Sequence, residues 1–219
     1  MQAQFHALLT FWFHFVETQG YLGVFLLMAL ESSIVPIPSE IIMPPAAYWA
    51  AQGRMDFWLV VAAGAAGGLF GSLVCYGVAR AAGAPAILRW GRYVLMPPQK
   101  VEAAENWVRE YGVSGIFFSR LLPVVRHLIS VPAGILRMPV AAFCVATTAG
   151  AFLWDLILAW FGRQVIGDQP HLLDSPEQLA LVLREKTHLI VLGILALAAA
   201  YALMLWLQKR SSAHAASRA

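Results

Sequence analysis

Long apolar runs dominate the pattern of hydrophobic and polar positions along the chain. Residues 57–79 contain no charged side chain and end at Arg80. Residues 140–162 form a second run, interrupted by Asp155, and residues 189–207 form a third. A helix needs about 20 apolar residues to cross the hydrocarbon core of a bilayer, because each residue advances it by about 1.5 Å. The pattern therefore predicts at least three full transmembrane helices.

Two further apolar segments contain residues that interrupt a regular helix. The interrupting residues are Pro36, Pro38, Pro44 and Pro45 in the first segment, and Pro123, Pro132 and Gly134 in the second. A proline inside a helix removes a hydrogen bond and clashes with the preceding turn. At membrane depth, broken backbone is tolerated only where it is buried in protein or lines a cavity. We therefore predict two re-entrant helical hairpins, at about residues 36–53 and 121–138.

An internal repeat places these hairpins in a larger arrangement. Residues 66–80 align without gaps on residues 149–163, and each copy follows one predicted hairpin. Because a hairpin returns to its own side, the span between the two hairpins puts them on opposite faces. The predicted fold class is thus an all-α polytopic membrane protein with an inverted repeat, as in secondary transporters.

The same pattern divides the chain into four parts. They are an N-terminal amphipathic or interfacial helix (1–19), a transport core (20–166), a polar extracytoplasmic loop (167–187), and a C-terminal transmembrane helix with a basic cytoplasmic tail (188–219). The basic residues cluster on the face that holds the arginine hairpin and the C-terminus, and the positive-inside rule makes that face cytoplasmic.

Composition agrees with a membrane location. Hydrophobic residues make up 60% of the chain and charged residues 12%, with a mean hydropathy of +0.67. Soluble domains carry about 25% charged residues, so a soluble enzyme is excluded. A sequence pI of about 9.1 would suggest nucleic acid in a soluble protein. Here the basic residues flank apolar segments, which is the pattern of membrane orientation, and no nucleic-acid partner is expected.

Four charged residues in the predicted core are the main candidates for chemistry: Glu31, Glu40, Arg120 and Arg126. Placing an arginine at the centre of a membrane helix costs about 2.5–3.5 kcal/mol of insertion free energy. Other interactions must therefore compensate the cost of these two arginines. They could snorkel to the interface, or form a purely structural ion-pair cluster with the glutamates. We prefer a binding site, because arginine pairs suit a phosphate and glutamates in apolar surroundings can exchange protons near neutral pH.

Two further ionisable residues have weaker claims. Asp155 lies in the second apolar run and could act as an auxiliary group, or simply hydrogen-bond to a neighbouring helix. His127 follows Arg126 and could tune the site, although a packed neutral histidine is the simpler interpretation. We find no metal-ligand cluster, nucleotide loop or nucleophile motif, so neither a metal, a cofactor nor an enzymatic activity is expected.

These residues carry a resemblance to a known family. The spacing Glu31-x4-Pro36-x-Pro38-x-Glu40, followed by Phe118-x-Arg120-x2-Pro123-x2-Arg126 and Ala133-Gly134, resembles the DedA family of bacterial membrane proteins. Eukaryotic relatives of that family include lipid scramblases of the endoplasmic reticulum. The resemblance implies two opposed re-entrant hairpins and dependence on proton-motive force. It also implies translocation of undecaprenyl phosphate, the recycled lipid carrier of cell-wall synthesis.

The resemblance assigns roles to the four charged residues. Arg120 and Arg126 would bind the substrate phosphate, and Glu31 and Glu40 would couple transport to protons. The expected function is a proton-linked flippase of an anionic lipid carrier in the bacterial cytoplasmic membrane. A proton-coupled transporter of a small solute or ion, and a broad phospholipid scramblase, are the alternatives. Homo-oligomerisation is left open.

Overall fold

All regular structure in the described part of the chain is α-helical. The structure is a computed structural model that describes residues 2–33, 39–90, 98–122 and 125–166. Its helices are α1 (Gln2–Glu31), α2 (Ser39–Ala51), α3 (Phe57–Trp90), α4 (Pro98–Arg120), α5 (Val125–Leu128), α6 (Ser130–Ile135) and α7 (Val140–Ile166). The predicted loop at 167–187 and the C-terminal span at 188–219 lie outside the described residues.

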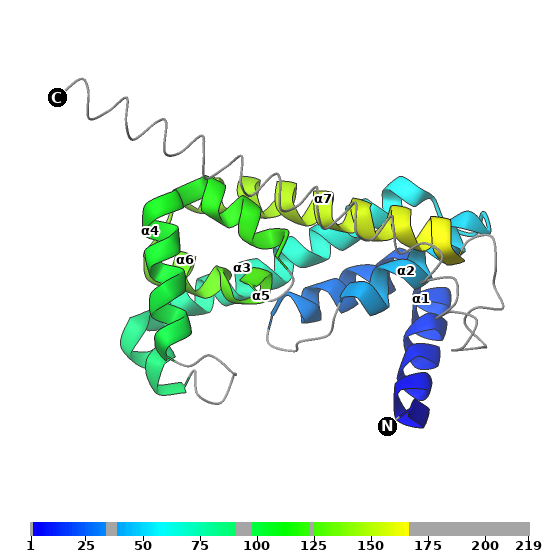
Figure 1. The fold of residues 1–219 in the computed structure, drawn as a ribbon, viewed down its shortest axis with the longest axis horizontal. Helices are drawn as coiled ribbons and strands as arrows, with labels where there is room; N and C mark the ends of the chain where they lie inside the picture. Colours follow the sequence, from blue (N-terminus) through cyan, green and yellow to red (C-terminus); the bar gives the residue numbers. More distant parts are fainter. Residues whose placement is uncertain (1, 34–38, 91–97, 123–124, 167–219) are drawn as a thin grey trace, which may run out of the picture. The chain divides into compact units, whose positions relative to one another are not determined.

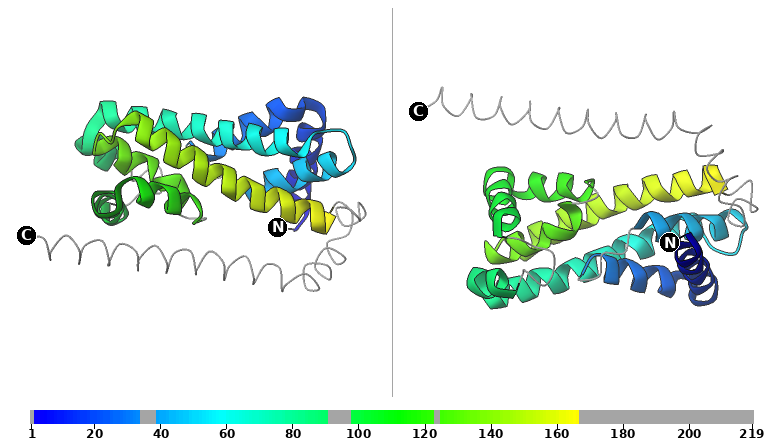
Figure 2. Two further views of the ribbon diagram at one scale, coloured as in Figure 1. Left: turned by 90° about the horizontal axis from the view of Figure 1, so that it is seen from above. Right: turned by 60° about the horizontal axis from the view of Figure 1, so that its bottom comes forward.

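Two helices form the centre of the fold. Among the described residues, Phe57–Ala84 of α3 and Val140–Gln164 of α7 are long and apolar enough to cross a membrane. Both coincide with runs that the sequence pattern predicts as spans. The helix α3 continues past its predicted end at Arg80 and bends at Gly83. The two helices lie side by side and run antiparallel (Figures 1 and 2).

The two helices that precede the chain reversals are bent in the same way. Gly20 of α1 has a φ of 59° and a ψ of −136°, and Gly112 of α4 has a φ of 52° and a ψ of −127°. Glycine adopts such positive φ values without the steric cost that a side chain would add. After its bend, α1 packs against α3, and α4 packs against α7. The order of bent helix, returning helix and long helix therefore occurs twice.

The packing of the two halves follows the sequence repeat. A Cβ atom at Gly67 of α3 would collide with the carbonyl oxygen of Phe25 in α1. A Cβ atom at Gly150 of α7 would lie 2.8 Å from the carbonyl oxygen of Phe117 in α4. Gly67 and Gly150 are equivalent in the alignment of residues 66–80 with 149–163. Each bent helix thus approaches the long helix of its own half at the same position.

The returning helices cross to the opposite half. The helix α6 packs on α3, where Gly134 contacts the backbone of Tyr76, and α2 packs on α7, where Gly162 contacts Pro44. The halves are therefore interlocked through both long helices. The bent helices end near the middle of these long helices, since α1 contacts Gly71 of α3 close to its own C-terminal end.

The first chain reversal differs from the expected one. We predicted that residues 36–53 fold back on themselves, but residues 39–51 form the single helix α2, with Pro44 and Pro45 inside it. The chain reverses earlier, between the end of α1 and the start of α2. Tertiary packing overrides the local cost of the two prolines, because α2 buries Ile42, Met43 and neighbouring alanines against other helices.

Pro132 and Gly134 are also not the helix breaks that we expected. Both lie inside α6, which begins at Ser130. Pro132 is in the first turn, where a backbone N–H has no partner within the helix and its loss costs little. The chain reverses between the end of α4 at Arg120 and the start of α5 at Val125. The expected breaks at Pro36, Pro38 and Pro123 lie outside the described residues.

Rows of large apolar side chains are exposed along three helices. They are Leu22, Leu26 and Leu30 on α1, Trp58, Leu59, Phe70, Val74 and Val78 on α3, and Val140, Val145, Phe152, Leu153 and Trp160 on α7. Spacings of four residues on α1 and α3, and of seven residues on α7, place many of them on one face of each helix. Monomeric soluble proteins rarely expose apolar patches of this extent, whereas lipid covers them without cost.

The close approach at Gly67 predicts that alanine lowers thermal stability at this position but not at Gly77 of the same helix. Gly67→Ala should lower the thermal stability of the detergent-solubilised protein, because α1 must move away from α3. Gly77→Ala on the same helix should leave it unchanged or raise it by about 1 kcal/mol, since nothing lies within 4 Å of the added methyl group. Thermal unfolding followed by size-exclusion chromatography measures both. Equal effects at the two positions would contradict the packing of α1 on α3.

Candidate functional site

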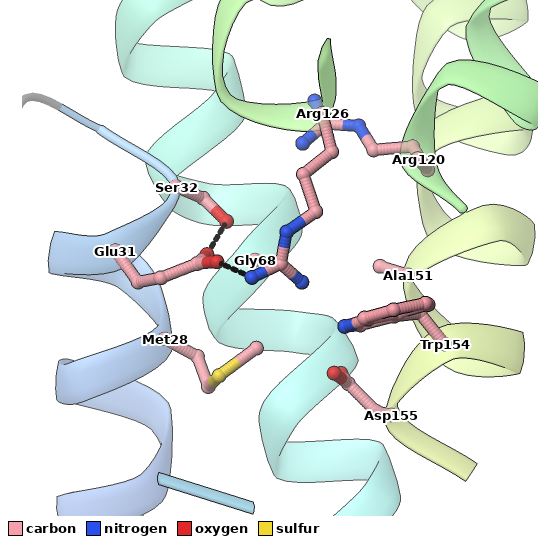
Figure 3. A pocket seen from close by; sticks show the side chains of 9 residues that line it. All are labelled: Met28, Glu31, Ser32, Gly68, Arg120, Arg126, Ala151, Trp154 and Asp155. Carbon is pink, nitrogen blue, oxygen red and sulfur yellow. Dashed lines mark hydrogen bonds and ion pairs between the residues drawn. The ribbon is translucent and has the colours of Figure 1, made fainter. Parts of the chain in front are cut away.

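The ends of the two chain reversals meet at a buried ion pair. Glu31 is the last residue of α1 and Arg126 belongs to α5, and each is at most 5% exposed. The Nη2 atom of Arg126 forms an ion pair with Oε1 of Glu31 (Figure 3). Ser32 donates a hydrogen bond of 2.7 Å to the other carboxylate oxygen of Glu31. Residues far apart in the sequence are thus joined at one point.

Glu40 and His127 extend this pair. The Oε2 atom of Glu40, the second residue of α2, lies 4.0 Å from Nη2 of Arg126. Its side chain is 42% exposed, whereas that of Glu31 is 2% exposed. The Nδ1 atom of His127 lies 3.2 Å from the backbone oxygen of Glu31 and 3.6 Å from its Oε1 atom. Arg126 therefore lies close to two carboxylates, one buried (Glu31) and one partly exposed (Glu40).

Arg120 is buried beside the pair with few partners. It is the last residue of α4, is 4% exposed, and donates a hydrogen bond of 2.8 Å from Nη2 to Oγ of Ser130. The Nε atoms of Arg120 and Arg126 have no hydrogen-bond partner in the described part of the chain. Guanidinium groups carry five donors each, and buried donors favour an acceptor. The site therefore holds spare donors for an anion.

Trp154 forms one wall of the site. The guanidinium carbon of Arg126 lies 5.3 Å from the centroid of the Trp154 ring, a cation–π distance. The indole N–H donates a hydrogen bond of 3.1 Å to Oγ of Ser39, the first residue of α2. Trp154 thus connects α7 with both the arginine and the start of α2.

These groups line a small pocket that also contains Asp155. The lining residues are Met28, Glu31, Ser32, Gly68, Arg120, Arg126, Ala151, Trp154 and Asp155 (Figure 3). In this conformation the pocket has room for roughly one water molecule. A larger anion can enter only if the helices around the pocket move apart.

The sequence indicated some of these residues and missed others. Glu31, Glu40, Arg120, Arg126, His127 and Asp155 were selected because they are ionisable groups in apolar segments, and the structure brings them to one region. The sequence pattern does not indicate Ser32, Ser130 or Trp154. Serine and tryptophan are common in membrane helices, so their positions beside a charged candidate, such as Trp154 before Asp155, were the only signal.

Similar proteins were found by comparison with known sequences. The VTT domain matches residues 37–164. "Undecaprenyl phosphate transporter A" of Bacillus subtilis (strain 168) is 34% identical over 150 residues, which cover 68% of this chain and 74% of the relative. The Staphylococcus aureus (strain NCTC 8325 / PS 47) protein of the same name is 29% identical over 153 residues, covering 68% and 75%.

A third relative carries a different name. "Alkaline phosphatase-like protein" of Lactococcus lactis subsp. cremoris (strain MG1363) is 30% identical over 196 residues, which cover 87% of this chain and 88% of the relative. No solved structure matches the chain.

The fold, the site and these matches define the class of protein. Apolar spans, exposed apolar rows and charges buried between helices are the features of a helical membrane protein. The match to the VTT domain covers more than half of the sequence. The chain therefore belongs to the VTT-domain family, also called the DedA family, which confirms the resemblance seen in the sequence motifs.

Proposed function

We propose that this protein is a flippase that moves an anionic lipid carrier, undecaprenyl phosphate, across the bacterial cytoplasmic membrane. The observation that carries the proposal is the pair of buried arginines, Arg120 and Arg126, whose donors are incompletely used. Two guanidinium groups can bind phosphate oxygens through several charge-assisted hydrogen bonds. The names of the Bacillus and Staphylococcus relatives supply the lipid.

The proposal includes an arrangement in the membrane. The helices α3 and α7 would span the bilayer, and a third span would follow at 188–219. The bent ends of α1 and α4 with their returning helices would form re-entrant hairpins that enter from opposite faces. Support comes from the contact of α1 with Gly71 and of α4 with Gly150, both near the middle of a long helix.

Sidedness follows from charge. The basic C-terminal tail and the hairpin that contains the arginines would face the cytoplasm, and the loop at 167–187 would lie outside. Residues 1–19 would form an interfacial helix, and residues 20–166 the transport core. The lipid phosphate would pass between the hairpins at the level of Arg126 while the polyprenyl tail remains in the bilayer.

Competition for Arg126 would link transport to protons. A phosphate that binds Arg126 displaces Glu31 and Glu40, whose carboxylates are then left without their cation. A buried carboxylate without a partner takes up a proton more readily than a paired one. When a carboxylate releases this proton, it again competes for the arginine and helps to expel the phosphate. The small volume of the pocket agrees with a state in which the glutamates hold the arginine.

The two alternatives differ in what the site must do. A small-solute transporter would accept free phosphate and would not require a lateral opening to lipid. A broad scramblase would move several phospholipids without headgroup choice and without proton coupling. Phosphate binding is common to the lipid-carrier flippase and a phosphate transporter, so the lipid assay must include inorganic phosphate as a competitor.

The test is a flipping assay in proteoliposomes with a pH difference across the membrane. One pH unit supplies about 1.4 kcal/mol per proton, enough to shift the lipid about tenfold between the leaflets. We expect this shift for undecaprenyl phosphate and not for zwitterionic phospholipids. Glu31→Gln and Glu40→Gln should abolish the shift while retaining part of the downhill flipping, because glutamine mimics the protonated acid.

Glu17→Gln is the matched control, because Glu17 pairs with Arg54 at an exposed site. It should behave as the wild type. Phosphate release is measured in parallel, since one relative is named for a phosphatase. Flipping of all phospholipids at equal rates, or an unchanged pH response in both glutamine variants, would contradict the proposed coupling.

A further inference from the structure

Asp155 is a buried acid whose carboxylate has no hydrogen-bond partner among the described residues. The residue is 0% exposed, and neither carboxylate oxygen has a hydrogen-bond partner in the described part of the chain. It nevertheless lines the same pocket as Glu31 and Arg126 (Figure 3). The interpretation that Asp155 only hydrogen-bonds to a neighbouring helix is therefore not supported, since each described helix packed around it leaves both oxygens free.

On the side of α3 and α2, Asp155 faces apolar groups. A Cβ atom at Gly64 of α3 would lie 2.8 Å from Oδ2 of Asp155 and 3.1 Å from the sulfur of Met43 in α2. The charged groups that act on Asp155 are Glu31 of α1 and Arg126 of α5, and Arg126 is already paired with Glu31. Burying an ionised carboxylate without a partner costs far more free energy than burying the protonated acid.

The sequence repeat shows that this acid is specific to the second half. The alignment that pairs Gly67 with Gly150 places Asp155 opposite Ser72 of α3. Ser72 is also buried, but its hydroxyl donates a hydrogen bond of 2.5 Å to the carbonyl oxygen of Gly68 in its own helix. A small residue such as serine would therefore fill the position of Asp155 equally well. Packing alone does not explain why a carboxyl group is found there.

The position of Asp155 along α3 and α7 indicates the side from which a proton would reach it. Asp155 lies beside Gly64 of α3, while Ser32 beside the ion pair faces Gly68. Four residues of helix correspond to about 6 Å, so Asp155 is displaced from the ion pair toward the Phe57 end of α3. In the membrane arrangement proposed above, this end faces the outside, from which protons enter under a proton-motive force.

We propose that Asp155 is a proton-binding site that serves the Glu31–Arg126 pair. Asp155 carries one proton while Glu31 holds Arg126. When the lipid phosphate displaces Glu31 from Arg126, the O–H bond of Asp155 breaks and an O–H bond forms on the Glu31 carboxylate, through the water for which the pocket has room. Asp155 is then an anion and is reprotonated from outside. This step rests on the proposed function and deepens it, because it gives the proton an entry point.

Infrared spectroscopy of the purified full-length protein tests the proton directly. A protonated carboxyl group absorbs at a C=O stretching frequency separate from that of a carboxylate. We expect this band near neutral pH in the wild type, a shift of the band with carboxyl-¹³C aspartate, and its loss in Asp155→Asn. Adding undecaprenyl phosphate should add a glutamic-acid band in the wild type but not in Glu31→Gln, while the aspartic-acid band is present again once Asp155 has been reprotonated.

Thr147→Val is the matched control, because Thr147 is a buried residue of α7 whose hydroxyl has no partner among the described residues. It removes an unpaired polar group that cannot titrate, and the band should persist. A band that is insensitive to the aspartate label, or that remains in Asp155→Asn, overturns the inference. If Asp155→Asn does not fold, the shift of the band with carboxyl-¹³C aspartate in the wild type still tests the inference.

Transport separates this inference from the proposed function. Asp155→Asn should lose most of the tenfold shift that one pH unit produces, while part of the downhill flipping of undecaprenyl phosphate remains. A wild-type protein with the aspartic-acid band but without any flipping would refute the proposed function and leave the proton site standing. Normal proton-driven flipping by Asp155→Asn would refute the role of Asp155 and leave the function standing.

Discussion

Replacing Arg126 with alanine is expected to abolish transport of undecaprenyl phosphate in proteoliposomes. Arg126 contacts Glu31, lies 4.0 Å from Glu40 and stacks over Trp154, so it connects α1, α2 and α7 with α5. Its removal deletes a phosphate ligand and leaves Glu31 buried without a cation. Breaking a buried ion pair on one side costs about 3–5 kcal/mol, so this variant should also lose stability.

Two further variants separate the loss of binding from the loss of stability. The double variant Glu31→Gln with Arg126→Gln removes both charges of the buried pair and should recover part of the lost thermal stability without recovering transport. Arg126→Lys should recover transport only in part, because an ammonium group lacks the planar fork of guanidinium. Arg120→Ala should abolish transport with a smaller effect on stability, since its hydrogen bond goes to the neutral hydroxyl of Ser130.

Arg54→Ala is the matched control, because Arg54 also pairs with a glutamate but its side chain is 61% exposed. It should retain wild-type transport and stability. Full transport by the double variant of Glu31 and Arg126 would contradict the site, because it would show that the ion pair is only structural. Full activity of Arg126→Lys would indicate simple charge balance in place of bidentate phosphate binding.

The sequence predicted the helices that depend on hydrophobicity alone. The apolar runs at 57–79 and 140–162 correspond to α3 and α7 because length and composition are sufficient to specify such spans. It was wrong that the prolines at 44, 45 and 132 interrupt the helices, because the cost of a proline depends on its place in the helix. Pro132 falls in a first turn, and Pro44 is compensated by packing against α7. Neither circumstance is visible in a local pattern.

The site was predictable as far as it consists of charges in apolar segments. Such charges are costly and must meet one another, which is why Glu31, Glu40 and Arg126 could be placed together without knowledge of the fold. Hydrogen-bond partners such as Ser130 and walls such as Trp154 depend on how the helices cross. The partnerless state of Asp155 likewise follows from packing, because the sequence shows the acid but not its position beside Gly64.

Cysteines at positions 52 and 137 are expected to react with a membrane-impermeant maleimide from opposite sides of the membrane. Gln52 follows α2 and Arg137 follows α6, and both are exposed. Each follows one of the two proposed hairpins, so the inverted arrangement puts Gln52 outside and Arg137 in the cytoplasm. The experiment uses full-length protein without Cys75 and Cys144, in right-side-out and inside-out vesicles. Arg137 has a φ of 53°, and cysteine tolerates this angle about as well as arginine does.

Labelling is all or none in each vesicle type, so the outcome discriminates sharply. Gln52→Cys should react only in right-side-out vesicles and Arg137→Cys only in inside-out vesicles, and both should react after detergent is added. Reaction of both from one side would exclude hairpins that enter from opposite faces. The phosphate would then have no path that alternates between the two sides at the level of Arg126, and the flippase proposal would fail with the topology. Opposite-side labelling leaves the Glu31–Arg126 pair as the barrier that the lipid phosphate must open.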